Sequence, residues 1–153
     1  MYAADARHVN KALAEKLAHI YTLRGGPTID LTIRKPYLDL LEKLSNPHDN
    51  MPPVIHVAGT NGKGSTIAFL KAILNAAGYS VHTYTSPHLF QFNERITLAD
   101  QHIDDTQLEA TLDEVMAVNN GEGLTFFEVT TAMAFLAFSR VKADIVLLET
   151  GLG

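Results

Sequence analysis

The chain has 153 residues, a length that fits one domain of ordinary size and leaves little room for a complete multidomain enzyme. Twelve Lys and Arg against seventeen Asp and Glu give a formal net charge of -5, so a general surface for nucleic acid or anionic membranes is not expected. The sequence contains no cysteine, which excludes disulfides and thiolate metal sites and makes the cytoplasm the expected location. No stretch reaches the roughly 20 apolar residues that a membrane span requires.

Residues 1–50 have the pattern of a helical segment. A first amphipathic helix, ended by Gly25-Gly26-Pro27, is predicted by the spacing of Val9, Leu13, Leu17 and Ile20. A second helix follows, with Pro36 in its first turn and an apolar stripe of Tyr37, Leu40, Leu41 and Leu44.

From residue 51 the pattern changes to alternating strands and helices. An apolar run over residues 53–58 predicts a strand, and a glycine-rich turn then leads into a helix that Gly78 ends, with its stripe at Ile67, Leu70, Ile73 and Leu74. Residues 80–85 alternate as a strand does. Residues 93–103 suggest a small exposed hairpin.

The remaining sequence predicts two helices and a final strand. The first helix starts at Asp104 or Asp105 and has a stripe of Leu108, Leu112, Val115 and Met116. Residues 125–140 are apolar nearly all round, which is typical of a buried helix and places in the core Phe126, Phe127, Phe135 and Phe138. Residues 144–149 form a continuous apolar run, as in a strand buried on both faces. The alternation predicts an α/β fold in which a P-loop-type parallel sheet is flanked by helices.

A candidate phosphate-binding loop is Gly59-Thr60-Asn61-Gly62-Lys63-Gly64-Ser65-Thr66, between a predicted strand and a predicted helix. Glycines let backbone N–H groups converge on phosphate oxygens, and the following helix adds the positive end of its dipole. Lys63 can supply a full charge to the phosphates, and the hydroxyl of Ser65 or Thr66 can reach a magnesium ion. Gly64 separates the lysine from these hydroxyls, which departs from the common G-x-x-x-x-G-K-[ST] pattern.

A second candidate group is the carboxylate of Glu149, which ends the last predicted strand. Ligands gather at the carboxyl ends of parallel strands, so Glu149 and the glycine-rich loop are expected at one edge of the sheet. A carboxylate there can hold a magnesium ion that bridges nucleotide phosphates. Charged residues also commonly end strands without any such role, and that alternative stays open.

The sequence resembles the folylpolyglutamate synthase and dihydrofolate synthase family, which belongs with the Mur ligases. The resemblance depends on motifs in the family's order, which are GTNGKGST at 59–66, TSPHL at 85–89, ERI at 94–96, TFFE at 125–128 and ETGLG at 149–153. The segment Thr28-Ile29-Asp30-Leu31 is similar to the family's early pterin-site segment. The short glycine loop of Mur-type enzymes also accounts for the departure from the common P-loop.

The resemblance implies an ATP-dependent ligase that transfers the γ-phosphate to a pteroate or folate carboxylate, after which the amine of L-glutamate displaces phosphate. ATP and Mg²⁺ are the implied cofactors, with Gly59 to Thr66 at the nucleotide, Lys63 as the catalytic group, and Ser86 and Glu149 as magnesium ligands. The implied substrate site consists of Thr28, Ile29, Asp30, Leu31, Thr125, Phe126, Phe127 and Glu128. Whether the acceptor is dihydropteroate or a folate is left open, and members of the family are usually monomeric.

The resemblance also implies a domain organisation: residues 1–50 as an N-terminal helical segment, residues 51–153 as a truncated ATP-binding domain, and no C-terminal glutamate-binding domain. The sequence stops at Gly153 inside a motif, so we expect no ligation by this chain alone. A nucleotide-binding module without catalysis is the alternative function. A GTPase is disfavoured, because the sequence has no N-K-x-D motif.

Several of the residues named above have simpler explanations as well. Thr125 and Glu128 have the spacing of a helix capping box, which is compatible with a substrate role. Ser86-Pro87 has the composition of a turn. His56 and His82 are expected in strands rather than as metal ligands.

Overall fold

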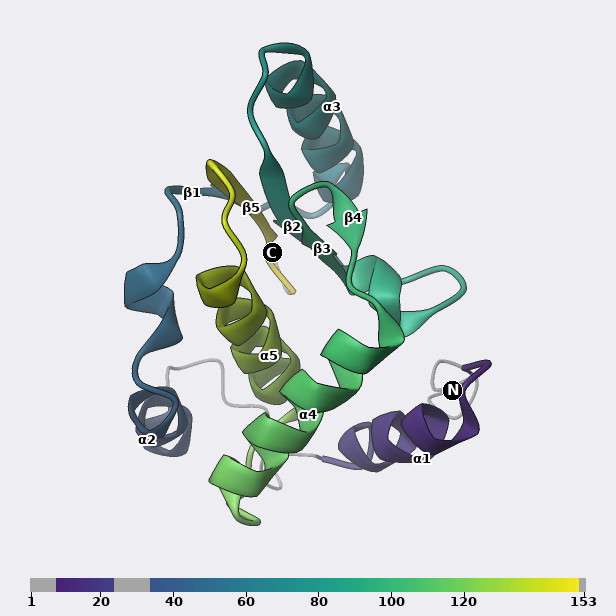
Figure 1. Cartoon of the computed structure of the whole chain (residues 1–153), viewed down its shortest axis with the longest axis vertical. Coiled ribbons are helices and arrows are strands. Elements are labelled where there is room, and N and C mark those ends of the chain that lie inside the picture. The colour runs from purple at the N-terminus through teal and green to yellow at the C-terminus, as the bar shows by residue number, and fades with distance from the viewer. Residues whose placement is uncertain (1–7, 24–33, 152–153) are drawn as a thin grey trace.

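The structure is a computed structural model that describes residues 8–23 and 34–151. A five-stranded sheet with strand order β1-β5-β2-β3-β4 is flanked by helices, as Figure 1 shows. The strands are β1 (Val54–Val57), β2 (Val81–Tyr84), β3 (Ile96–Leu98), β4 (Gln101–His102) and β5 (Ile145–Glu149). The helices are α1 (Lys11–Ile20), α2 (Lys35–Lys43), α3 (Lys63–Ala76), α4 (Asp105–Asn119) and α5 (Phe126–Arg140), with short 3-10 helices η1 (Pro47–Asn50) and η2 (Phe92–Arg95).

The three parallel strands are those predicted from the two apolar runs and from the alternation at residues 80–85. β5 lies between β1 and β2 and is parallel to both, with Val57 opposite Glu149 and Tyr84 opposite Leu148. Val146 and Leu147 of β5 are fully buried, as expected for a strand covered on both faces. The predicted α/β class with a mostly parallel sheet is therefore confirmed.

The predicted hairpin over residues 93–103 is present, because β3 pairs antiparallel with β4, but the expectation that it is exposed was wrong for β3. β3 also pairs antiparallel with β2 and continues the main sheet, and all three of its residues are buried. β4 is exposed. The strand is buried because β3 occupies the free edge of β2 and also packs against α5.

The two faces of the sheet are covered unequally. α3 covers one face alone, where Ile67 packs against Val81 and Leu147. The other face packs against α5 and α4 in the main core, as the layering in Figure 1 also shows. Ile73 was expected on the buried stripe of α3 but is 64% exposed, because a single helix on that side gives its outer surface no neighbour.

The N-terminal helices join the main core. Leu13, Leu17 and Ile20 of α1 are fully buried in the same cluster as Leu40 of α2 and residues of the sheet and α5. Val9 was expected on the same stripe but is exposed, because Asn10 is the N-cap and Val9 precedes the helix. Residues 25–27, the expected end of this helix, lie outside the described residues, and the division of the chain after residue 50 stays a prediction.

The N-terminal caps of α4 and α5 are among those that the sequence predicts. The side chain of Asp104, rather than that of Asp105, accepts a hydrogen bond from Gln107 N and caps α4. Thr125 caps α5, whose inner residues are buried. In the described ranges 8–23 and 34–151, no helix is both long and apolar enough to cross a membrane.

Candidate nucleotide and metal site

Three candidate segments meet at the carboxyl edge of the parallel strands. The glycine-rich loop follows β1, Ser86 follows β2, and Glu149 ends β5. Thr150 N donates to Val57 O at 3.0 Å, which ties the end of β5 to the start of the glycine-rich loop. Ser86 N donates to Glu149 Oε2 at 2.9 Å. The structure therefore brings together residues that are 63 and more positions apart in sequence.

The glycine-rich loop has the backbone of an anion cradle. Gly59 and Gly62 have φ values of 149° and 75°, a region that favours glycine. Gly62 is the N-cap of α3, and no side chain caps the first turn of this helix. The uncapped N–H groups and the positive end of the helix dipole are therefore available to phosphate oxygens.

Lys63 is the first residue of α3, and its side chain lies over the glycine-rich loop. Its Nζ donates to Gly59 O at 2.8 Å. In the described ranges, Lys63 forms no ion pair with a carboxylate. A phosphate oxygen that enters the loop can therefore take the charge of Lys63 without first breaking a salt bridge.

Glu149 is a buried carboxylate with a backbone partner and no cation. It is 7% exposed, and in the part of the chain that the structure describes it has no ion pair. A buried charge is costly unless it is paired or binds a metal, so a cation fits beside Glu149. Nowhere in residues 8–23 and 34–151 do three His, Asp or Glu gather as a metal cluster. A magnesium ion here would thus take its other ligands from the Ser86 hydroxyl, phosphate and water.

Glu128 serves helix capping and also forms a buried ion pair. Its Oε2 accepts from Thr125 N and Thr125 Oγ1 at 2.7 and 2.8 Å, and its backbone N–H donates to Thr125 Oγ1. Arg34 Nε donates to Oε1 at 2.9 Å, and Arg34 Nη2 donates to Oε2. Burial acts to raise the pKa of Glu128, but hydrogen bonds from Arg34 and Thr125 hold that pKa below its ordinary value. The capping-box prediction is confirmed, whereas a substrate role for Glu128 stays a prediction.

The aromatic residues of the TFFE segment face different ways. Phe126 packs in the core, where its ring stacks on Tyr21 with centroids 4.4 Å apart. Phe127 was expected in the core but is 42% exposed, because it lies in the first turn of α5 at the rim of the sheet. A Cβ added to Gly151 would lie 2.5 Å from the Phe127 ring, so this ring borders the end of β5. Thr28 to Leu31 lie outside the described residues.

Sequence reasoning assigned no role to the charged residues of the ERI motif. Glu94 accepts three backbone N–H groups, from Leu89, Phe90 and Gln91, at 2.7 to 2.8 Å. Burial acts to raise the pKa of Glu94, but these hydrogen bonds hold it below its ordinary value. A carboxylate five residues after Leu89 was the available signal, although the loop conformation that unites the three N–H groups is not readable from spacing.

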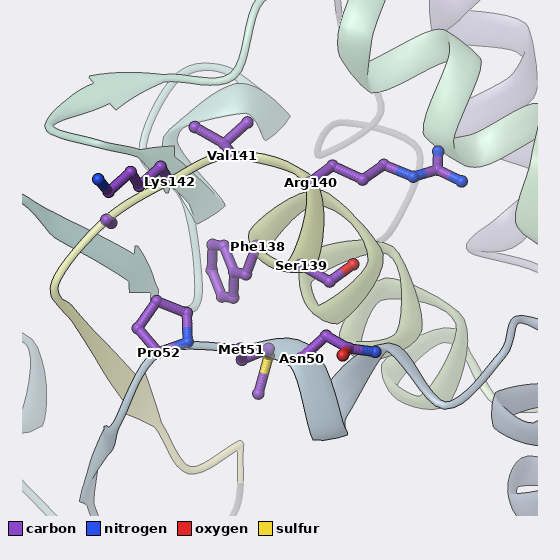
Figure 2. A pocket seen from close by; sticks show the side chains of 9 residues that line it. Asn50, Met51, Pro52, Phe138, Ser139, Arg140, Val141 and Lys142 are labelled. Carbon is purple, nitrogen blue, oxygen red and sulfur yellow. The ribbon is translucent and has the colours of Figure 1, made fainter.

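A cavity of about 450 Å³ lies at the opposite edge of the sheet and is not part of this site. Figure 2 shows that its wall comes from Asn50, Met51 and Pro52, before β1, and from the end of α5 and the residues after it, Phe138 to Lys142. β1 and β5 begin beside this cavity, whereas the candidate site lies where they end. A second cavity of about 420 Å³ shares Asn50, Ser139 and Arg140 with it.

Comparison with known proteins places the chain among folate enzymes. No family model matches it. A dihydrofolate synthase/folylpolyglutamate synthase from Bacillus subtilis is 44% identical over 121 residues, which are 74% of this chain and 28% of that protein. The structure of Escherichia coli FolC in complex with DHPP and ADP has a TM-score of 0.82 and 36% identity, and the match covers 92% of this chain and 33% of that one.

A bifunctional folylpolyglutamate synthase/dihydrofolate synthase from Yersinia pestis, complexed with AMPPNP and Mn ion, matches equally well. Its TM-score is 0.82 and its identity 36%, again over 92% of this chain and 33% of the other. The chain thus spans a third or less of the length of these proteins.

Proposed function

Because the chain belongs to the folylpolyglutamate synthase and dihydrofolate synthase family, matching its N-terminal part, we propose that it forms the ATP- and magnesium-binding part of a carboxylate–amine ligase. The nucleotide would lie on the loop from Gly59 to Thr66, with its phosphates at the first turn of α3. ADP in the Escherichia coli relative and AMPPNP with Mn ion in the Yersinia pestis relative support this proposal.

Each charged group at the carboxyl edge has a task in such a reaction. A nucleotide and a carboxylate repel each other, and the Lys63 ammonium would offset the charge that develops on the transferred phosphoryl group. The uncapped N–H groups of α3 would orient the phosphates. Glu149 and the Ser86 hydroxyl would hold magnesium, which supplies a further positive charge at the phosphate oxygens.

The acceptor carboxylate would come from a pterin substrate, either dihydropteroate or a folate. The first turn of α5, at Thr125 to Glu128, would bind it, and the segment Thr28 to Leu31 would contribute to the same substrate site. Phe127 gives that region an exposed aromatic face beside Gly151, which suits a flat heterocycle. DHPP in the Escherichia coli structure supports a substrate of this kind. L-Glutamate would then attack the acyl phosphate and release phosphate, leaving an amide.

The observation that carries the nucleotide proposal is the buried Glu149 carboxylate, without a cation, beside an uncapped glycine loop. The test is isothermal titration calorimetry of the 153-residue chain with an ATP analogue that cannot be hydrolysed, with and without magnesium. We expect Lys63→Ala and Glu149→Gln to weaken binding about 10-fold or more, since each removes a charge from the phosphate region.

The matched control is Lys142→Ala, which removes an exposed lysine at the opposite edge of the sheet. Equal affinities of the Lys63→Ala and Lys142→Ala variants would contradict the phosphate-loop assignment. Release of ADP in the presence of glutamate and either pterin substrate separates ligation from nucleotide binding alone. The expectations that this chain alone does not catalyse ligation, and that it is cytoplasmic, stay predictions.

A further inference from the structure

Arg95 is a buried cation that an imidazole and two aromatic rings surround. Its side chain belongs to η2, and the residue is 6% exposed. In residues 8–23 and 34–151, no carboxylate forms an ion pair with it. Burying an unpaired guanidinium costs free energy, so its neighbours must compensate the charge by other means.

The compensation comes from an imidazole and two aromatic rings. Arg95 Nε donates to His88 Nδ1 at 2.8 Å. The guanidinium carbon lies 5.4 Å from the centroid of the Phe92 ring and 5.3 Å from that of Phe126, which are cation–π distances. Phe92 and Phe126 themselves meet edge to face with centroids 6.3 Å apart. Arg95 is therefore the centre of a cluster that spans two distant parts of the chain.

The two parts belong to different halves of the proposed site. His88 stands two residues after Ser86, on the loop that leaves β2 at the metal edge. Phe126 is the first residue of α5, in the TFFE segment proposed to bind the pterin substrate. Through one side chain, the metal-binding loop is thus attached to the beginning of the substrate-binding helix.

The loop from Ser86 to Gln91 has few other anchors. Glu149 holds Ser86 N, and Glu94 holds the N–H groups of Leu89, Phe90 and Gln91. The side chains of Leu89 and Phe90 are both 83% exposed, so apolar packing contributes little to the position of this loop. The position of this loop therefore depends mainly on hydrogen bonds. The bond from Arg95 Nε to His88 Nδ1 connects the loop to the ring cluster, as does the contact between the His88 and Phe92 rings, whose centroids are 5.9 Å apart.

We infer that Arg95 is a positioning residue that holds the Ser86 loop against α5, so that the metal-binding hydroxyl and the pterin-binding segment keep a fixed relative geometry. The inference rests on the proposed function. Arginine suits this place because its planar guanidinium donates from Nε while its faces lie on aromatic rings, which an ammonium group cannot reproduce. An arginine Nε–H only donates, so His88 Nδ1 must be the acceptor, and neutral His88 then carries its proton on Nε2.

The first measurement tests the anchor itself, without nucleotide. Nitrogen-15 NMR of the wild-type chain should show His88 Nδ1 as a hydrogen-bond acceptor, and the signal of this nitrogen should shift in the Arg95→Lys variant. Hydrogen exchange at the amides of Leu89, Phe90 and Gln91 should become about 10-fold faster in the variant, while exchange in β2 and β5 stays unchanged. The control is Arg140→Lys, which changes an exposed arginine paired with Glu114.

The second measurement tests the role in the site. Loss of an interaction that orients a metal ligand typically costs 10- to 100-fold in metal affinity, so Arg95→Lys should raise the magnesium concentration for half-maximal nucleotide binding by about 10-fold or more. His88→Ala removes the acceptor but leaves Arg95 against its aromatic rings, so this variant replaces Arg95→Lys in the test if Arg95→Lys does not fold. His88→Ala should raise the magnesium concentration for half-maximal binding by a similar factor. The double variant should need no more magnesium than either single variant.

The outcomes separate the two proposals. A wild-type chain that binds no nucleotide in magnesium overturns the proposed function. A wild-type chain that binds, together with Arg95→Lys and His88→Ala variants of unchanged magnesium dependence, overturns the positioning role alone. An unchanged His88 Nδ1 signal together with unchanged amide exchange at Leu89, Phe90 and Gln91 in Arg95→Lys overturns the anchor on which that role depends.

Discussion

Replacement of Glu128 by glutamine measures the value of the buried ion pair at the start of α5. The side chains of Glu128 and Arg34 are each 13% exposed, so the pair is largely shielded from water. Glutamine keeps the size and one acceptor oxygen of glutamate, but it removes the negative charge that faces the Arg34 guanidinium. The change therefore tests the charge rather than the packing.

The expected cost follows from the geometry. Removing one partner of a fully buried ion pair costs about 3–5 kcal/mol, and a hydrogen bond to a charged group is worth about 1.5–3 kcal/mol. Because the pair retains some exposure and Arg34 also donates to Gly123 O at 3.0 Å, we expect the free energy of unfolding to fall by about 2–4 kcal/mol. Urea unfolding followed by far-UV circular dichroism gives this value from the shift in midpoint at constant slope.

Glu114→Gln is the matched control. Arg140 donates to both oxygens of Glu114 at 2.7 Å, which gives the same pair of chemical groups, but these side chains are 53% and 40% exposed. An exposed pair contributes about 1 kcal/mol or less, so this variant should unfold close to the wild-type midpoint. If Glu128→Gln costs no more than Glu114→Gln, burial does not strengthen the Arg34 pair and the reasoning is refuted.

Three further predictions concern acid stability, the core and the rim of the site. The pKa of Glu128 lies below its ordinary value of 4.5, so its contribution is present above that pH and is lost as the pH falls through the lower folded pKa. The urea midpoints of wild type and Glu128→Gln should therefore approach each other as the pH falls below 4.5, and a constant gap would contradict this. Leu17→Ala should lower the free energy of unfolding by about 2–5 kcal/mol because Leu17 is fully buried, whereas Leu38→Ala, at a half-exposed site in α2, should change it by about 0.5 kcal/mol or less in the same urea experiment. Gly151→Ala should displace the exposed Phe127 ring rather than the strand, so the NMR signals of that ring should shift while amide exchange in β5 stays unchanged.

The parallel part of the sheet could be predicted because its strands are short and mainly apolar. The run at residues 145–148 belongs to a strand whose Val146 and Leu147 are fully buried, and the run at residues 53–58 is mainly apolar although β1 is largely exposed. The glycine-rich loop could be predicted because its positive φ values restrict which residues fit. In both cases the information is local.

The hairpin of the antiparallel part could be predicted, but its burial could not, since that burial depends on distant partners. Asn93 and Arg95 are buried although both are polar, and nothing in their spacing indicates it. Asn93 donates to Ile103 O and accepts from His8 Nε2 at 2.9 Å, across 85 residues of sequence. An exposed hairpin and a sheet edge covered by helices therefore have the same alternation of polar and apolar residues.

The contacts of Glu128 show the same difference between local information, which the sequence carries, and long-range information, which only the fold provides. The capping box joins residues three positions apart, so the sequence could show it. The ion pair with Arg34 spans 94 residues, and only the fold brings the two side chains together. One carboxylate meets both needs, because it has two oxygens and Thr125 engages only Oε2.

The contact partner of a charged residue shows more clearly than its burial whether the residue stabilises the fold or is available to bind a ligand. Arg34 and Glu128 neutralise each other, so they can stabilise the fold without any ligand. Lys63 and Glu149, at one edge of the sheet, hydrogen-bond to backbone groups instead, at Gly59 O and Ser86 N. A backbone group orients a charge but does not cancel it, so each keeps its electrostatic attraction for phosphate or for a cation. Arg95, held by an imidazole and two rings, belongs with Lys63 and Glu149 by this criterion, which is why we expect its loss to affect the site more than the fold.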